Sequence, residues 1–207
     1  MKIIKKAFLL CLISFSVISC ASVHLPIPGE TAAFKHNIYT EYYAIADAYY
    51  DLAKYDKAVN YYSLSMKNKD LYWSSYYKLA KSYVALSNWN EAEKIFKDLL
   101  KRDSSNINLM MSLAYVEAMN NNLEASEKLY QELWTNNPDN ADVLSNYINV
   151  KIALEKYDDA KELAATLKEK FKDNKNISTF EKYFEDLAKK EAEPAQNQDE
   201  NQTAASQ

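Results

Sequence analysis

The feature that most constrains the fold of this chain is a pattern of matching side chains that recurs every 34 residues. One column of the pattern consists of small residues: Ala58, Ala92, Ser126 and Ala160. Three residues before each of them stands a large side chain, in turn Tyr55, Trp89, Leu123 and Tyr157. Four residues after each stand Tyr62, Phe96, Tyr130 and Ala164. A fixed period of this length predicts a repeat protein in which each unit packs against its neighbours.

The composition indicates that these repeat units are helical. The 207 residues include one glycine and four prolines, whereas a β-rich fold needs turn residues every ten or so positions. Alanine, leucine, lysine and glutamate are abundant, and there are 17 tyrosines. We therefore predict an all-α protein with many aromatic side chains in its core.

The pattern resembles the tetratricopeptide repeat family, in which a pair of helices recurs every 34 residues. The resemblance covers residues 39–172 and places the small residues Ala46 and Ala80 where the two helices of a pair approach closely. Glu117 and Lys151 depart from it, since tyrosine is usual at their position. The resemblance implies a right-handed α-solenoid of about four helix hairpins followed by a C-terminal capping helix.

The pattern predicts helices near 38–53, 56–67, 71–86, 90–102, 107–120, 123–136, 140–154, 157–171 and 177–190. In the last of these, apolar residues such as Phe180 and Phe184 share one face, which suits a cap over the end of the array. Asparagines are expected to cap helices or to adopt left-handed geometry at the turns inside the hairpins: Asn88, Asn120, Asn121 and Asn122. Pro138 is expected between the third and fourth hairpins.

The amino-terminal residues resemble a bacterial lipoprotein signal peptide. Three lysines precede an apolar run from Ala7 to Ile18, which is too short to span a bilayer, where about 20 residues are needed. The run ends within the sequence Val17-Ile18-Ser19-Cys20, which is similar to a lipobox. The resemblance implies cleavage before Cys20 and acylation of its thiol, and Ala21 favours retention in the outer membrane over the inner membrane. An ordinary secretory cleavage site is the alternative.

These patterns divide the chain into four parts. We expect a signal peptide at 1–19, a lipid-bearing cysteine and flexible tether at 20–37, a repeat domain with its capping helix at 38–190, and a disordered polar tail at 191–207. The expected location is the cell envelope, with the membrane contacted through the lipid anchor.

Little in the sequence favours catalysis. The histidines, His24 and His36, lie in or beside the expected tether, where neither has the rigid surroundings that an acid–base site or a metal site needs. One glycine is too few for a phosphate-binding loop, and a formal charge of −4 does not favour nucleic acid. We expect a protein that is not an enzyme, with no metal and no cofactor apart from covalent diacylglycerol and an N-acyl lipid on Cys20.

The resemblance implies that binding residues lie on the first helix of each hairpin and face a concave groove. The residues of this sequence at such positions are Tyr43, Asp47, Tyr50, Tyr77, Lys81, Met111, Tyr115 and Asn149. Tyrosine and methionine offer apolar area with polar or adaptable tips, which suits an extended peptide or an amphipathic helix. Filler or a self-association surface is the alternative reading of these aromatic side chains.

Two functions follow from this layout. The first is a non-catalytic adaptor or scaffold that binds envelope proteins or peptides in the groove, in outer-membrane, secretion or pilus assembly. The alternative is a solute- or lipid-binding lipoprotein that serves a transport system. The sequence leaves the oligomeric state and the identity of the partner open.

Overall fold

The computed structural model describes residues 30–204, and this part of the chain contains nine α-helices and no strand. Their bounds are α2 (Glu30–Asp51), α3 (Tyr55–Ser65), α4 (Tyr72–Ala85), α5 (Trp89–Arg102), α6 (Ile107–Met119), α7 (Leu123–Asn136), α8 (Ala141–Ala153), α9 (Tyr157–Lys170) and α10 (Ile177–Ala204). The chain divides into two units, residues 1–38 and 39–207. The first unit is described only from residue 30, where α2 begins, and the helix array belongs to the second unit.

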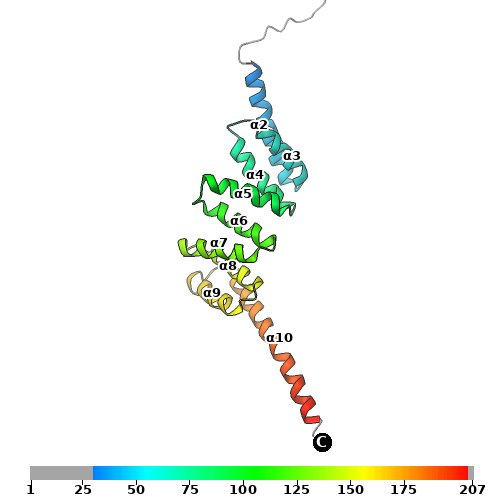
Figure 1. The fold of residues 1–207 in the computed structure, drawn as a ribbon, viewed down its shortest axis with the longest axis vertical. Coiled ribbons are helices and arrows are strands. Elements are labelled where there is room, and N and C mark those ends of the chain that lie inside the picture. Colours follow the sequence, from blue (N-terminus) through cyan, green and yellow to red (C-terminus); the bar gives the residue numbers. More distant parts are fainter. Residues whose placement is uncertain (1–29, 205–207) are drawn as a thin grey trace, which may run out of the picture. The chain divides into compact units, whose positions relative to one another are not determined.

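From α3 to α9, each helix packs against the next one along the chain (Figure 1). The aromatic ring of Tyr43 in α2 contacts that of Tyr62 in α3, with centroids 5.7 Å apart, so α2 and α3 form the first hairpin. The others are α4/α5, α6/α7 and α8/α9, and α10 packs against α9. This is the predicted all-α tetratricopeptide-type solenoid.

The columns of the 34-residue pattern form the core. Ala58, Ala92, Ser126 and Ala160 are all 0 % exposed. The same holds for Ala46, Ala80, Ala114 and Ile148 on the partner helices. Small side chains on one helix let the other approach, and the large rings of Tyr62, Phe96 and Tyr130 fill the remaining space at 0 %, 1 % and 2 % exposure. Each such ring contributes roughly 1.5–3 kcal/mol through burial.

The turns inside the hairpins are also periodic. Ala53, Ser87, Asn121 and Glu155 have φ angles of 55°, 58°, 64° and 58°. Left-handed geometry was expected at the turn asparagines, and it occurs at Asn121. The prediction that Asn88 and Asn122 cap helices with their side chains was wrong. Both stand at the start of a helix, but neither side chain accepts a hydrogen bond from its backbone. Asn122 donates instead to the Glu117 carboxylate at 2.9 Å.

The caps that do form lie between hairpins. The Asn106 side chain accepts a hydrogen bond from the Leu109 backbone N–H at 3.2 Å, and that of Asn140 accepts from Asp142 and Val143 at 3.0 and 3.1 Å. Pro138 lies between α7 and α8 as predicted.

The two outer helices are longer than predicted. Helix α2 begins at Glu30 rather than near residue 38, so it includes part of the expected tether. Helix α10 continues to Ala204 through most of the segment expected to be a disordered tail. Cys20, the signal peptide and most of the tether lie outside the described residues. Within residues 30–204, no helix combines the length and the apolar character needed to cross a membrane.

Candidate functional site

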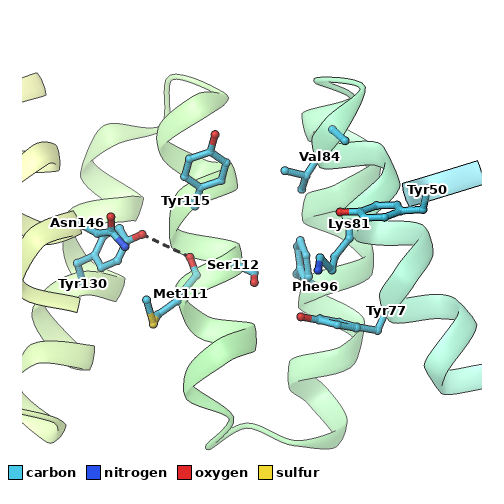
Figure 2. Close-up of a pocket in the computed structure, with 11 residues that line it drawn as sticks. Tyr50, Tyr77, Lys81, Val84, Phe96, Met111, Ser112, Tyr115, Tyr130 and Asn146 are labelled. Carbon is cyan, nitrogen blue, oxygen red and sulfur yellow. Dashed lines mark hydrogen bonds between the residues drawn. The ribbon is translucent and has the colours of Figure 1, made fainter. Parts of the chain in front are cut away.

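A pocket of about 310 Å³ opens between the first helices of neighbouring hairpins. Five of the eight predicted binding residues line it: Tyr50, Tyr77, Lys81, Met111 and Tyr115. Figure 2 shows Tyr50, Tyr77 and Lys81 on one side of the pocket and Met111 and Asn146 on the other. The 34-residue period brings these side chains together because it places equivalent positions of successive hairpins side by side.

A second pocket, of about 240 Å³, continues the first one towards α8. It is lined by Asn149, the sixth predicted residue, and shares Tyr115, Tyr130 and Asn146 with the first pocket. We call the two pockets together the groove. Its walls come mainly from α4, α6 and α8, with Tyr50 contributed by α2.

Tyr43 and Asp47, the remaining two predicted residues, line neither pocket. The Tyr62 hydroxyl donates a hydrogen bond to the Asp47 carboxylate, which also pairs with the Lys78 ammonium at 3.1 Å. Burial, together with that hydrogen bond, raises the pKa of Tyr62 above its usual value. Burial and the neighbouring Asp47 also raise the pKa of Tyr43. Tyr43 and Asp47 therefore help to hold α2 against its neighbours, Tyr43 through α3 and Asp47 through α3 and α4.

The sequence reasoning did not place Phe96, Tyr130, Ser112 or Asn146 in the groove, although all four line it. Phe96 and Tyr130 belong to the second helices of their hairpins, and both line the groove although they are almost fully buried. The Tyr130 hydroxyl donates to the Met111 carbonyl at 3.5 Å (Figure 2). The signal that could have revealed these rings is their recurrence opposite the small residues of the first helices.

The face that α8 presents to the groove differs from that of α4 and α6. Ser145 stands where Tyr77 and Met111 stand in the preceding hairpins, yet it is only 2 % exposed. Asn146 and Asn149 line the groove instead. The groove is thus aromatic along α4 and α6 and carries amides along α8.

Lys81 is the one charged residue that lines the groove within the described part of the chain. Its ammonium lies 5.6 Å from the centroid of the Tyr50 ring and makes no ion pair among the described residues. Burial raises the pKa of Tyr50 above its usual value. The groove thus presents apolar area, hydroxyl and amide groups and one cation.

Among the described residues, those that line the groove include no histidine, cysteine or carboxylate. Among residues 30–204, no group of three or more histidine, cysteine, aspartate or glutamate side chains is arranged to hold a metal ion.

Comparison with protein families gives two matches, both described as tetratricopeptide repeat. One covers residues 77–141 and the other residues 118–181. Residues 77–181, and with them α4 to α9 apart from the first five residues of α4, therefore consist of tetratricopeptide repeats. No curated protein sequence matches the chain significantly.

Solved structures share the fold at low sequence identity. A tetratricopeptide repeat protein from Parabacteroides merdae has a TM-score of 0.61 at 20 % identity, covering 75 % of this chain and 60 % of that one. MamA from Desulfovibrio magneticus has a TM-score of 0.60 at 12 % identity, with coverages of 66 % and 77 %. A thermophilic repeat protein from Thermus thermophilus has a TM-score of 0.51 at 19 % identity, with coverages of 65 % and 75 %.

Proposed function

We propose that this tetratricopeptide-repeat chain is a non-catalytic adaptor of the bacterial cell envelope that holds a segment of another protein in its groove. The tetratricopeptide-repeat fold suggests a scaffold for protein–protein interaction. The observation that carries the proposal is the groove itself, which is lined by Tyr50, Tyr77 and Tyr115 together with Lys81, whose ammonium makes no ion pair among the described residues.

The groove fits a peptide segment with apolar side chains better than a charged polymer. Tyr115 is 45 % exposed, so its ring is available to a partner, and Met111 beside it can adapt to different shapes. The tyrosine hydroxyls and the Asn146 amide can bond to the backbone of an extended segment or to polar groups along an amphipathic helix.

Site-specific photo-crosslinking in intact envelopes tests the groove. We would replace Tyr115 with a photo-reactive phenylalanine analogue in the full-length chain. We expect crosslinks to a defined protein, and we expect Tyr77→Ala or Lys81→Glu to abolish them. Both substitutions change the groove wall, and because Tyr77→Ala also removes a ring contact with the buried Phe96, circular dichroism verifies that this variant is folded. Tyr43 is left unchanged, because its ring packs against Tyr62.

Trp73 provides the matched control, since it is an aromatic residue of similar exposure, 41 %, that lies outside the groove. The analogue at position 73 should not yield the same product. Equal products from positions 73 and 115, or a product that survives both groove substitutions, would contradict the proposal.

The envelope location and the lipid anchor are proposed from the lipobox-like Val17-Ile18-Ser19-Cys20. In cells fed labelled palmitate, the protein should carry the label and sediment with membranes. Cys20→Ala should lose both properties, whereas Cys11→Ala should keep them, because Cys11 would be removed with the signal peptide. A wild-type protein without label would contradict the anchor. Ala21 favours the outer membrane, which fractionation of the two membranes checks.

The size and lining of the first pocket also support the second candidate function, the binding of a small apolar solute or lipid. Its volume of about 310 Å³ is at the lower end of the range typical of small-molecule sites. Native mass spectrometry of the purified full-length chain distinguishes the two functions. A bound small molecule that is lost in Tyr77→Ala would favour solute handling over the adaptor.

A further inference from the structure

A second cleft lies at the C-terminal end of the array, between α9 and α10, away from the groove. Its volume is about 490 Å³. The floor is apolar and includes Ala164 and Ala165 of α9 with Phe180, Phe184 and Ala188 of α10. Helix α10 is the next helix along the chain and packs against α9, and the cleft stays open along the contact between the two helices.

The rim of the cleft carries opposite charges on its two walls. The α9 wall has Lys161 and Lys168, and the α10 wall has Glu181 and Glu185. The Lys168 ammonium and the Glu181 carboxylate pair with each other at 2.6 Å. Lys161 and Glu185 make no ion pair among the described residues, although both line the cleft. One cation and one anion on opposite walls therefore remain available to an incoming partner.

We propose that the occupant of this cleft is a second copy of the chain, related by a two-fold axis. A two-fold interface uses the same patch on both subunits, so the patch must be complementary to itself. The charges on the rim meet this condition, because Lys161 can pair with the partner's Glu185 while Glu185 pairs with the partner's Lys161. The contact covers Phe184 and the apolar floor, and it leaves the groove open.

The sharpest test reverses each of the two charges in a separate variant. The full-length chain, purified in detergent, is examined by sedimentation equilibrium, and circular dichroism verifies that each variant is folded. We expect the wild type to dimerise. Lys161→Glu places two glutamates at each contact and Glu185→Lys places two lysines there, so each variant alone should dimerise roughly tenfold or more weakly.

A mixture of the two single variants should restore dimers. In the mixed pair, the glutamate at position 161 of one subunit meets the lysine at position 185 of the other, and the native Lys161 and Glu185 form the second contact. The rescue requires that position 161 of one subunit faces position 185 of the other. Lys128→Glu is the matched control, because Lys128 is an exposed lysine on α7 outside the cleft, and it should leave dimerisation unchanged.

Three results would overturn the proposal. One is a wild type that stays monomeric across the micromolar range, and another is a dimer that both charge reversals leave intact. The third is a mixture that dimerises no better than the single variants. None of these outcomes bears on the groove, because the photo-crosslinking test uses residues of other helices.

Discussion

At the residue scale, the four turns with positive φ show how the repeat tolerates local strain. Left-handed backbone costs an ordinary residue about 1–2 kcal/mol, whereas asparagine adopts it more readily and glycine at no steric cost. The chain has only one glycine, Gly29, and uses alanine, serine, asparagine and glutamate at these turns. The strain recurs once per hairpin. The packing of the buried side chains of the two flanking helices offsets its free-energy cost.

Ala53→Gly should therefore stabilise the protein by about 0.5–1 kcal/mol, because relief of the left-handed strain exceeds the extra backbone entropy that glycine loses on folding. Urea denaturation followed by circular dichroism measures the change. Asn121→Gly is the control and should give a change near zero. Equal gains at both positions would show that side-chain strain is not the cause.

Two residues that depart from the repeat pattern carry buried charges. Glu117 and Lys151 stand where the first two hairpins have Tyr49 and Tyr83. The Glu117 carboxylate pairs with the Lys97 ammonium at 2.9 Å, and the Lys151 ammonium pairs with Glu127 at 2.8 Å. The sequence showed both departures but not these partners, because Lys97 lies 20 residues before Glu117 and Glu127 lies 24 before Lys151.

Lys151→Met should destabilise the protein by roughly 3 kcal/mol, because it removes one partner of a buried ion pair and leaves Glu127 dependent on Lys156. Thermal and urea unfolding measure the loss. Lys101→Met is the control: its ion pair with Asp98 is exposed, so its removal should cost less than about 0.5 kcal/mol. Similar losses in both variants would argue against a special role for the buried pair.

At the scale of single elements, the two ends of the array differ. Leu79, Leu113 and Tyr147 are 7 %, 6 % and 6 % exposed, whereas Ile45, at the equivalent position of α2, is 37 % exposed. No described helix precedes α2, so nothing in the described chain covers this face. At the other end, Phe180 of α10 is 4 % exposed and packs with Leu144, Ile148 and Leu167. Helix α10 therefore caps the C-terminal hairpin, as its apolar face predicted.

Phe180→Ala should lower the free energy of unfolding by roughly 3–5 kcal/mol through the loss of buried area and the cavity that remains. Chemical denaturation gives the value. Phe34→Ala, at a ring that is 66 % exposed, should change stability little. If the two substitutions cost the same, α10 would not serve as a cap.

The repeat pattern marks the inner helices of the array more closely than the two outer ones. Inner helix ends were predicted within one or two residues, because each is set by a residue of the repeat and its turn. The outer ends of α2 and α10 were not, since no repeat continues beyond them to mark a boundary.

In the groove, the period located Tyr77, Met111 and Tyr115. The period could not show that the Asp47 carboxylate is already bonded to Tyr62 and Lys78, because these contacts depend on side-chain packing between three helices.

At the scale of the whole molecule, ion pairs between neighbouring hairpins make stability depend on pH. Burial disfavours the charged form of Glu127, but hydrogen bonds from Lys151 and Lys156 outweigh it and lower the pKa of the carboxyl below its usual value of 4.5. The folded state then binds fewer protons than the unfolded state at mildly acidic pH. This contribution is present above about pH 4.5 and is lost as the pH falls through the lowered pKa.

We therefore expect the urea midpoint to decrease as the pH falls below about 4.5. In Lys151→Met the decrease should be shallower, because the carboxyl of Glu127 has lost one of the two ammonium groups that lower its pKa. Urea titrations at a series of pH values measure both slopes. Parallel profiles for the two proteins would assign the acid sensitivity to other carboxylates.

No single hairpin supplies the whole groove. Tyr77 and Lys81 stand on α4, Met111 and Tyr115 on α6, and Asn146 and Asn149 on α8, so each side moves with a different repeat. Its width is consequently set by the twist from one hairpin to the next. An occupant that contacts two walls binds best at one angle between the hairpins, and once bound it holds them at that angle. Substitutions in the packing between α5 and α6 should then change the angle between the hairpins, and with it the width of the groove and its affinity. They would do so without altering any residue that the occupant touches.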